Sequence, residues 1–458
     1  MENVTRSLAD FAVGLQFERL EKALVTKFKK YLLDGIGCGL HGTSQPWARI
    51  ISRYIVGQEG KREATLWLQD FQGPSANVAL GLGVMIHSFD FDDYHNAKVH
   101  PGAAVISAAL AVGEATGAAG SDVLAAMVAG YEAMIRVSLA TGPNSSRLKG
   151  WHLTGTTGTF GAAAAAGNLL GLSGEQMANA LGLAGTQSAG LWAFTADGAM
   201  SKRFHPGRSA QSGVMAAMLA RMGFTGPTLI LEAEDGGFCR ATSDQVDLSL
   251  VTQDLGVRFV GAETNIKPYA CCASSHSAVD AVLSLTARNA FGPGDVEKIL
   301  VKTAGSVVVQ CGFEYQAKSV LQAQMSLQYI VAVALLEGAA LLEQFSDAKI
   351  ADPRVVELAG RVQFVVDPDI DRLYPGRYAN QVEIALKNGQ RYEARIDFPR
   401  GSVEHPMSFD EVAAKFRSLA GHAVPAARAE VIIETVERAE ELGDIRELTG
   451  LLASLPDG

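Results

Sequence analysis

Residues 76–115 read ANVALGLGVMIHSFDFDDYHNAKVHPGAAVISAALAVGEA, a charged loop between two apolar segments. The spacing predicts a helix over 76–86 and a second, rich in small residues, over 103–115. Eight ionisable side chains fall in the sixteen residues between them: Asp90, Asp92, Asp93, His87, His95, His100, Tyr94 and Lys98. Because each ionisable group is costly to bury unpaired, this concentration between buried helices predicts a site that moves protons.

Within the loop, Asp90 and His100 are the first candidates for chemistry. His100 directly precedes Pro101-Gly102, and proline is favoured at the first position of a helix. The partial positive charge of a helix N-terminus disfavours protonation of an imidazole, which predicts a neutral His100 that acts as a base. Asp90 is expected to orient that ring or to act as the base itself. For Asp92 or Asp93 alone, a capping role in a polar loop is favoured.

Two further histidines precede segments of small residues. His152 follows Gly150-Trp151, and His205-Pro206-Gly207 is expected to open another helix. Cationic side chains surround the second motif: Lys202, Arg203 and Arg208. Helix N-termini and cations together favour anion binding, so three such helix starts in one domain predict a pocket for a substrate with several carboxylates.

A fourth motif, KPYACCASSH over 267–276, lies where the composition changes. Lys267 or His276 is expected to reach a cleft between domains, a common location for a binding site. The adjacent Cys271 and Cys272 are more typical of core residues than of nucleophiles. Cysteine and histidine spacings typical of metal sites are absent from the sequence, so we expect no metal and no other cofactor.

Composition limits the function classes. The 458 residues are 48% hydrophobic and only 19% charged, which indicates a core-rich globular protein of more than one domain. A net charge of −10 argues against general nucleic-acid binding. The N-terminal residues lack an apolar leader, and the apolar runs are too short or too rich in glycine to span a membrane. The five cysteines are an odd number, so they cannot all form disulfides within the chain. We therefore expect a cytoplasmic protein with reduced thiols.

The patterning predicts a mainly α fold of two domains. A helical domain is expected over 1–265, and a smaller α+β domain over 266–404 with strands at Val296–Thr303, Arg361–Asp367, Asn380–Leu386 and Arg391–Phe398. Asn388-Gly389 between the last two strands is a hairpin signal. The chain then returns to helices, and residues 405–458 are expected to rejoin one of the domains, with the helical domain favoured.

Taken in order, these motifs resemble the MmgE/PrpD family, which includes 2-methylcitrate dehydratases, cis-aconitate decarboxylases and an iminodisuccinate epimerase. The similarity covers nearly the whole chain. Its pieces are His87–Asp93 with His100-Pro101, Gly150–His152, Lys202 with His205 and Gly207, Lys267–Tyr269 with His276, Ser326–Tyr329, Pro399–Gly401 and Pro406-Met407.

The resemblance implies a large all-helical domain, a smaller α+β lid domain, a homodimer, and lyase or isomerase chemistry without a metal. It implies catalytic roles for Asp90, Tyr94, His100, His152 and Lys202. The accompanying substrate-binding residues are expected to be Lys98, Arg203, His205, Arg208, Lys267 and His276. Tyr94 stands where the family commonly has threonine, so the resemblance leaves the substrate open.

We therefore predict a cofactor-independent lyase, a dehydratase or decarboxylase of a small di- or tricarboxylate such as 2-methylcitrate or cis-aconitate. Removing a proton or CO2 next to a carboxylate leaves enediolate-like charge, which Lys202 and helix N-termini would stabilise. A histidine or carboxylate would move the proton. One alternative is an epimerase of a dicarboxylate such as iminodisuccinate, which needs bases on both faces of the carbon. The other is a non-enzymatic polycarboxylate-binding protein, against which the combination of candidate acids and bases argues.

Overall fold

The computed structural model describes residues 3–374 and 376–454, and the chain forms two compact units. The helical unit combines Met1–Thr264 with Ser408–Gly458, and the smaller unit comprises Asn265–Met407. The sequence placed these divisions at 265/266 and 404/405. The prediction of a mainly α fold with a smaller α+β part is confirmed.

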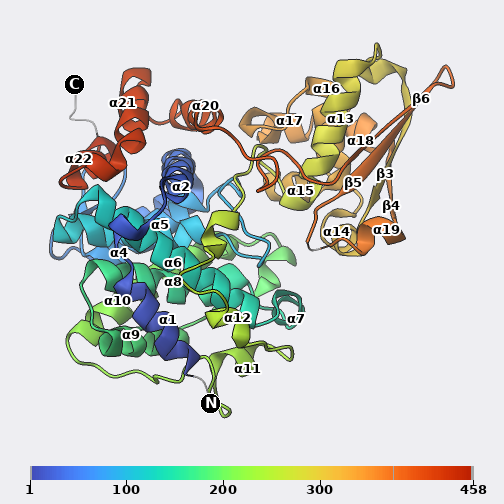
Figure 1. The fold of residues 1–458 in the computed structure, drawn as a ribbon. Helices are drawn as coiled ribbons and strands as arrows, with labels where there is room; N and C mark the ends of the chain where they lie inside the picture. Colours follow the sequence, from blue (N-terminus) through green and yellow to red (C-terminus); the bar gives the residue numbers. More distant parts are fainter. Residues whose placement is uncertain (1–2, 375, 455–458) are drawn as a thin grey trace. The chain divides into compact units, whose positions relative to one another are not determined.

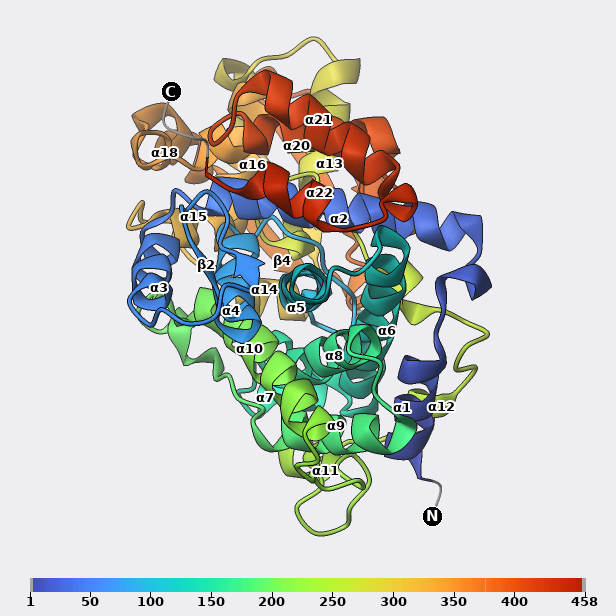
Figure 2. The ribbon, with the colours of Figure 1, turned by 90° about the vertical axis from the view of Figure 1, so that its left-hand side faces the viewer.

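The helical unit is built around one buried helix, α5. In Figure 2, α5 is seen end-on, with α2, α4, α6 and α8 around it. The helices before the smaller unit are α1 Val4–Gly14, α2 Lys22–Gly42, α3 Pro46–Val56, α4 Ser75–Ile86, α5 Pro101–Thr116, α6 Gly120–Ala140, α7 Pro143–Leu148, α8 Leu153–Leu169, α9 Gly174–Thr186, α10 Ser201–Arg221, α11 Phe238–Thr242 and α12 Ser249–Thr252. Two short strands, β1 Ala64–Thr65 and β2 Gln72–Gly73, pair antiparallel beside them.

Glycine lets α4 and α10 approach each other closely. A Cβ atom on Gly83 of α4 would lie 2.6 Å from the Cα of Gly207 on α10, far inside van der Waals contact. The two backbones therefore touch without a side chain between them. This contact brings the end of α4, where His87 follows, close to the start of α10, which carries Lys202.

Helix α10 begins earlier than the sequence indicated. The expected start at Pro206 is wrong: the helix begins at Ser201, and Pro206 lies inside it. Proline lacks the N–H that would bond to the carbonyl of Lys202, but one missing bond near a helix N-terminus does not stop the helix. Lys202 is consequently held on the first helical turn and not on a loop.

The C-terminal helices return to the helical unit. They are α20 Phe409–Ala420, α21 Ala426–Glu437 and α22 Arg446–Thr449, and α20 packs against α2 (Figures 1 and 2). Lys415 of α20 reaches Asp34 of α2 with its Nζ atom 2.6 Å from the carboxylate, and both side chains are buried. The same ammonium donates a hydrogen bond to the carbonyl of Phe91 at 2.7 Å. One cation thus ties α20 and α2 to the loop after α4.

The smaller unit is a four-stranded sheet with helices. The strand order is β4-β3-β5-β6, in which β3 and β4 are parallel and the other pairs are antiparallel. The strands are β3 Val296–Thr303, β4 Val362–Val366, β5 Asn380–Leu386 and β6 Arg391–Ile396, as the sequence predicted to within two residues at each end. Helix α13, His276–Arg288, packs against β5 and β6 (Figure 1).

The segment expected as one helix over 319–337 forms two, α15 Val320–Met325 and α16 Leu327–Glu337. Ser326 separates them because its hydroxyl accepts a hydrogen bond from the N–H of Tyr329 and so caps the second helix. The remaining helices of this unit are α14 Gly305–Cys311, α17 Asp347–Ile350, α18 Pro353–Ala359 and α19 Pro368–Asp371.

Among the described residues, α6 is long and apolar enough to cross a bilayer by length and composition alone. Within the protein, 94% of its most apolar window is buried, as in a core helix of a globular domain.

We predict that Lys415→Met lowers the free energy of unfolding by about 3–5 kcal/mol, because it leaves the buried carboxylate of Asp34 without its cation. The double variant Asp34→Asn/Lys415→Met should recover part of this loss, since no charge remains buried. Urea denaturation of both variants measures the effect. A single variant as stable as the wild type would show that the pair does not hold α20 in place.

Candidate active site

The loop between α4 and α5 is strained and buried. Asp90 and Lys98 have positive φ angles of 55° and 61°, which are uncommon for residues other than glycine and concentrate at functional sites. Asp92 and Asp93 are 1% and 2% exposed. The two aspartates, for which the sequence favoured a capping role in a polar loop, are therefore buried, because the loop folds inward between the helices that flank it.

Asp93 is a buried acid that caps α5 from inside the protein. It accepts hydrogen bonds from the N–H of Gly102 at 3.0 Å and from the hydroxyl of Tyr131 at 2.6 Å. Burial, helped by the neighbouring Asp92 and opposed by these hydrogen bonds, raises the pKa of Asp93 to about 8. At neutral pH this carboxyl group is thus largely protonated.

An ion pair joins the loop to α10. The Nζ of Lys202 lies 2.9 Å from Oδ1 of Asp90, and both side chains are at least nine-tenths buried. His100 lies beside this pair, with its Nε2 3.9 Å from the same carboxylate oxygen. Lys202, Asp90 and His100, which come from two separate motifs, are thereby brought to one place.

His100 precedes α5 as its N-cap residue, as the sequence predicted. Its Nδ1 lies 2.9 Å from the carbonyl oxygen of Asp93. A carbonyl can only accept, so this ring nitrogen carries the hydrogen and Nε2 remains to face Asp90. The main-chain N–H of His100 donates to the hydroxyl of Thr154 at 3.1 Å, which fixes the start of α5 against α8.

His152 is the N-cap residue of α8, and it pairs with His205 of α10. Their Nδ1 atoms lie 2.9 Å apart, so one ring donates to the other. Burial, reinforced by nearby cations, lowers the pKa of His152 well below its usual value, and burial lowers that of His205 to about 4. Both rings are therefore neutral at physiological pH. The ring of His152 packs against Trp192 and Phe194, and that of His205 against Phe194.

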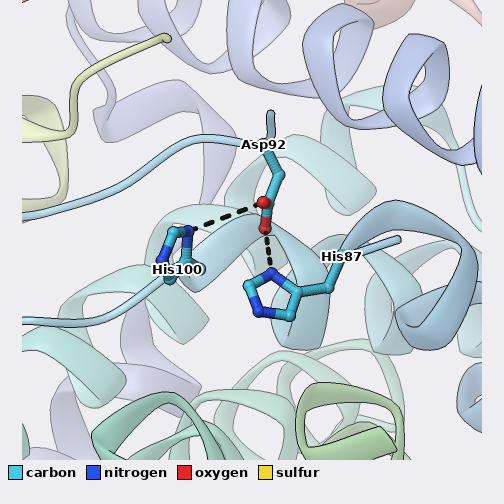
Figure 3. A group of neighbouring side chains, drawn as sticks. All are labelled: His87, Asp92 and His100. Atoms are coloured by element: carbon cyan, nitrogen blue, oxygen red, sulfur yellow. Dashed lines mark hydrogen bonds and ion pairs between the residues drawn. The ribbon is translucent and has the colours of Figure 1, made fainter. Parts of the chain in front are cut away.

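A third carboxylate connects two imidazoles. Oδ2 of Asp92 lies 2.8 Å from Nδ1 of His87, and its Oδ1 lies 3.6 Å from Nδ1 of His100 (Figure 3). His87 was counted in the charged stretch of the sequence but was not among the expected catalytic or substrate-binding residues. The signal that could have marked it is its position directly after an apolar helix, where a buried imidazole needs a partner.

The same three residues offer ligand atoms within 4.8 Å of one another, close enough for one metal ion. Hydrogen bonds, however, occupy Nδ1 of both rings, one with Asp92 and the other with the carbonyl of Asp93. The positive charge of Lys202 also lies beside the site. The arrangement therefore fits a hydrogen-bonded chain of acids and bases better than a cation site.

The other expected residues lie in varied surroundings. Tyr94 is buried in the loop, and Lys98 is half-buried in a tight turn. Arg203 is buried, donates to the carbonyl of Ser88 at 3.4 Å and lies over the ring of Trp47, so it supports the loop. Arg208 donates a hydrogen bond to Gln211 at 3.0 Å.

Lys267 and His276 are buried within the smaller unit, where His276 contacts the carbonyl of Cys271.

Comparison with known proteins places the chain among enzymes. The MmgE/PrpD N-terminal domain matches residues 6–251, and the MmgE/PrpD C-terminal domain matches residues 269–441. A cis-aconitate decarboxylase of Homo sapiens is 30% identical over 99% of this chain and 95% of its own length. One from Aspergillus terreus is 29% identical over 98% and 96%. A 2-methylcitrate dehydratase of Cupriavidus necator is 25% identical over 81% and 80%.

We predict that Asp93→Asn gains stability relative to the wild type as the pH rises from 5 to 8. The folded wild type keeps the Asp93 proton up to about pH 8, whereas the unfolded chain releases it near 3.8, so the contribution of Asp93 to stability falls over this range. An asparagine does not titrate, so the difference should grow by up to about 1.4 kcal/mol per pH unit. Urea unfolding at four pH values measures it, and parallel stability curves would contradict a protonated Asp93.

Proposed function

This chain belongs to the MmgE/PrpD family and is a lyase of that type, and we propose that it removes CO2 from a small unsaturated tricarboxylate such as cis-aconitate. The observation that carries the proposal is the buried ion pair of Lys202 and Asp90 beside His100. It provides a cation for the substrate's charge and a group for proton transfer in one water-poor place.

The relatives favour decarboxylation over dehydration. Cis-aconitate decarboxylases are 28–30% identical over 98–99% of the chain. The 2-methylcitrate dehydratases are 24–25% identical over 81–87%. Dehydration of a hydroxy tricarboxylate is the second candidate, because the same ion pair and imidazoles would serve it.

The proposed reaction uses the site as follows. The bond to the leaving carboxylate breaks, its electron pair moves into the conjugated alkene and a remaining carboxylate, and CO2 departs. Lys202 stabilises the charge that develops, which is worth most in a buried site. In place of the neutral base that the sequence predicted, we assign His100 the role of an acid. It takes a proton from solvent beside the carboxylate of Asp90, delivers it from Nε2 to carbon and is left neutral. Asp90 either holds His100 in place or carries the proton itself.

We also propose that the enzyme works without a metal or another cofactor, as a cytoplasmic homodimer. The first part is supported by the ammonium of Lys202, which supplies positive charge at the site. Light scattering that gives about twice the chain mass of 48.3 kDa would support the dimer.

The decisive test is incubation of the enzyme with di- and tricarboxylates in D2O, with and without EDTA, followed by NMR. Loss of a carboxylate from cis-aconitate supports the proposal. A new alkene from a hydroxy acid would show a dehydratase instead, and deuterium at a stereocentre without other change would show an epimerase. Activity that EDTA removes and a divalent ion restores would refute the cofactor-free mechanism.

We predict that Lys202→Ala lowers kcat/KM by roughly a hundredfold while the protein stays folded. The variant loses a charge-assisted contact worth about 3 kcal/mol in the transition state. Steady-state kinetics together with circular dichroism measure it. Arg221→Ala is the matched control, since that cation is exposed at the other end of the same helix. An unchanged rate for the Lys202 variant would exclude Lys202 from the site.

We predict that His100→Asn lowers kcat by roughly a hundredfold with little change in KM, because the amide cannot transfer a proton. Asp90→Asn discriminates between the two assignments: a milder loss means that Asp90 orients the ring, and an equal loss means that Asp90 is the proton-transfer group. If His100→Asn keeps the wild-type kcat, His100 only begins the helix.

A further inference from the structure

His87 is a buried imidazole at the centre of the site that the proposed function leaves unused. It is the C-cap residue of α4, and its side chain is 0% exposed. Its ring centroid lies 4.7 Å from that of His100 and 6.1 Å from that of His152. The ring therefore lies among the groups to which we assign catalysis.

The two nitrogens of His87 have different surroundings. Nδ1 lies 2.8 Å from the carboxylate of Asp92, which accepts its hydrogen and fixes the ring (Figure 3). Nε2 is buried and has no hydrogen-bond partner among the described residues. Leaving a buried polar atom unsatisfied costs free energy, so an atom of this kind inside a site indicates a ligand that completes it.

An unsatisfied ring nitrogen alone does not mark a site in this protein. Both nitrogens of His41, at the end of α2, are also buried without a partner among the described residues. The ring of His41 packs edge-on against Phe89 and His422, with no carboxylate to hold it. His87 differs because a carboxylate fixes one nitrogen while the other lies among the imidazoles of the site.

We propose that His87 is a further catalytic residue, whose Nε2 takes up a proton from solvent when the anionic substrate binds and donates it to a substrate carboxylate. Asp92 is the positioning residue that holds the ring and balances its charge. The inference rests on the proposed function, since it names the contact that this same site makes with a polycarboxylate. The titratable groups that face the ring are Asp92, His100, His152 of α8 and His205 of α10.

The protons of this step can be counted from substrate binding to product release. Binding adds one proton from solvent to Nε2, and the N–H then bonds to the carboxylate oxygen on which negative charge accumulates as the C–C bond breaks. The proton shifts toward that oxygen as the charge develops and returns to Nε2 when His100 protonates the carbon. His87 releases its proton to solvent when the product leaves, so each turnover consumes only the one proton that His100 delivers to carbon.

The test measures proton uptake when tricarballylate, a saturated tricarboxylate with no alkene to react, binds to the full-length protein. Calorimetry in two buffers of different ionisation enthalpy gives the number of protons taken up. His87→Gln should take up fewer protons than the wild type, by about half a proton or more. His41→Gln, the matched control with an equally unsatisfied imidazole outside the site, should match the wild type. Equal uptake by His87→Gln and wild type would overturn the inference.

Kinetics then test the catalytic role. His87→Gln should lower kcat about a hundredfold with a KM within about threefold of the wild type, the loss expected for one donor at a developing charge. Asp92→Asn should show a smaller loss, and the double variant should be no slower than His87→Gln, because the two residues act as one unit. A wild-type kcat for His87→Gln would reduce His87 to a binding contact and overturn the catalytic role.

The outcomes separate this inference from the proposed function. If the wild type turns over none of the acids, the proposed function fails, and the proton uptake with tricarballylate alone decides the role of His87. If the wild type is active but His87→Gln has the same uptake, only the His87 inference fails. Should His87→Gln not fold by circular dichroism, His87→Asn, which keeps a donor near Nδ1, replaces it in both measurements.

Discussion

The structure depends on pairing three carboxylates that a helical, mostly apolar unit has buried. Asp90 is paired with Lys202, Asp92 with His87, and Asp93 with the hydroxyl of Tyr131. An unpaired carboxylate buried there would lower the stability of the fold by several kcal/mol, so the loop can fold inward only if each carboxylate meets its partner. These partners come from α10, the end of α4 and α6, and the arrangement of the helices therefore decides whether the site exists.

The three pairings give the three carboxyl groups different chemical states. Asp90 faces an ammonium, Asp92 an imidazole and Asp93 a neutral phenol, and burial raises the pKa of Asp93 to about 8. On the other side of the site, burial keeps His152 and His205 neutral. A site that holds charged and neutral acids and bases together is suited to moving a proton beside a carboxylate, which is what the lyases of this family require.

The surrounding fold makes these pairings possible by close backbone contact and by one distant cation. Gly83 and Gly207 let α4 and α10 touch, so that the loop after α4 meets the first turn of α10. Lys415, which is more than three hundred residues further along the chain, donates a hydrogen bond to the carbonyl of Phe91, and Phe91 lies between Asp90 and Asp92. The return of the C-terminal helices to the helical unit thus supports the loop directly.

The sequence by itself determined the elements, the motifs and the family. Periodicity predicted α4 and α5, and strand composition located β3 and β5, because these signals are local. Motif order indicated Asp90, His100, His152 and Lys202. Only the tertiary structure decided that Asp92 and Asp93 are buried, that α10 begins before Pro206, and that His87 joins the site. Burial and hydrogen-bond partners depend on residues far apart in the chain, and the chemical state of a carboxylate or an imidazole is set by those neighbours and not by its place in the sequence.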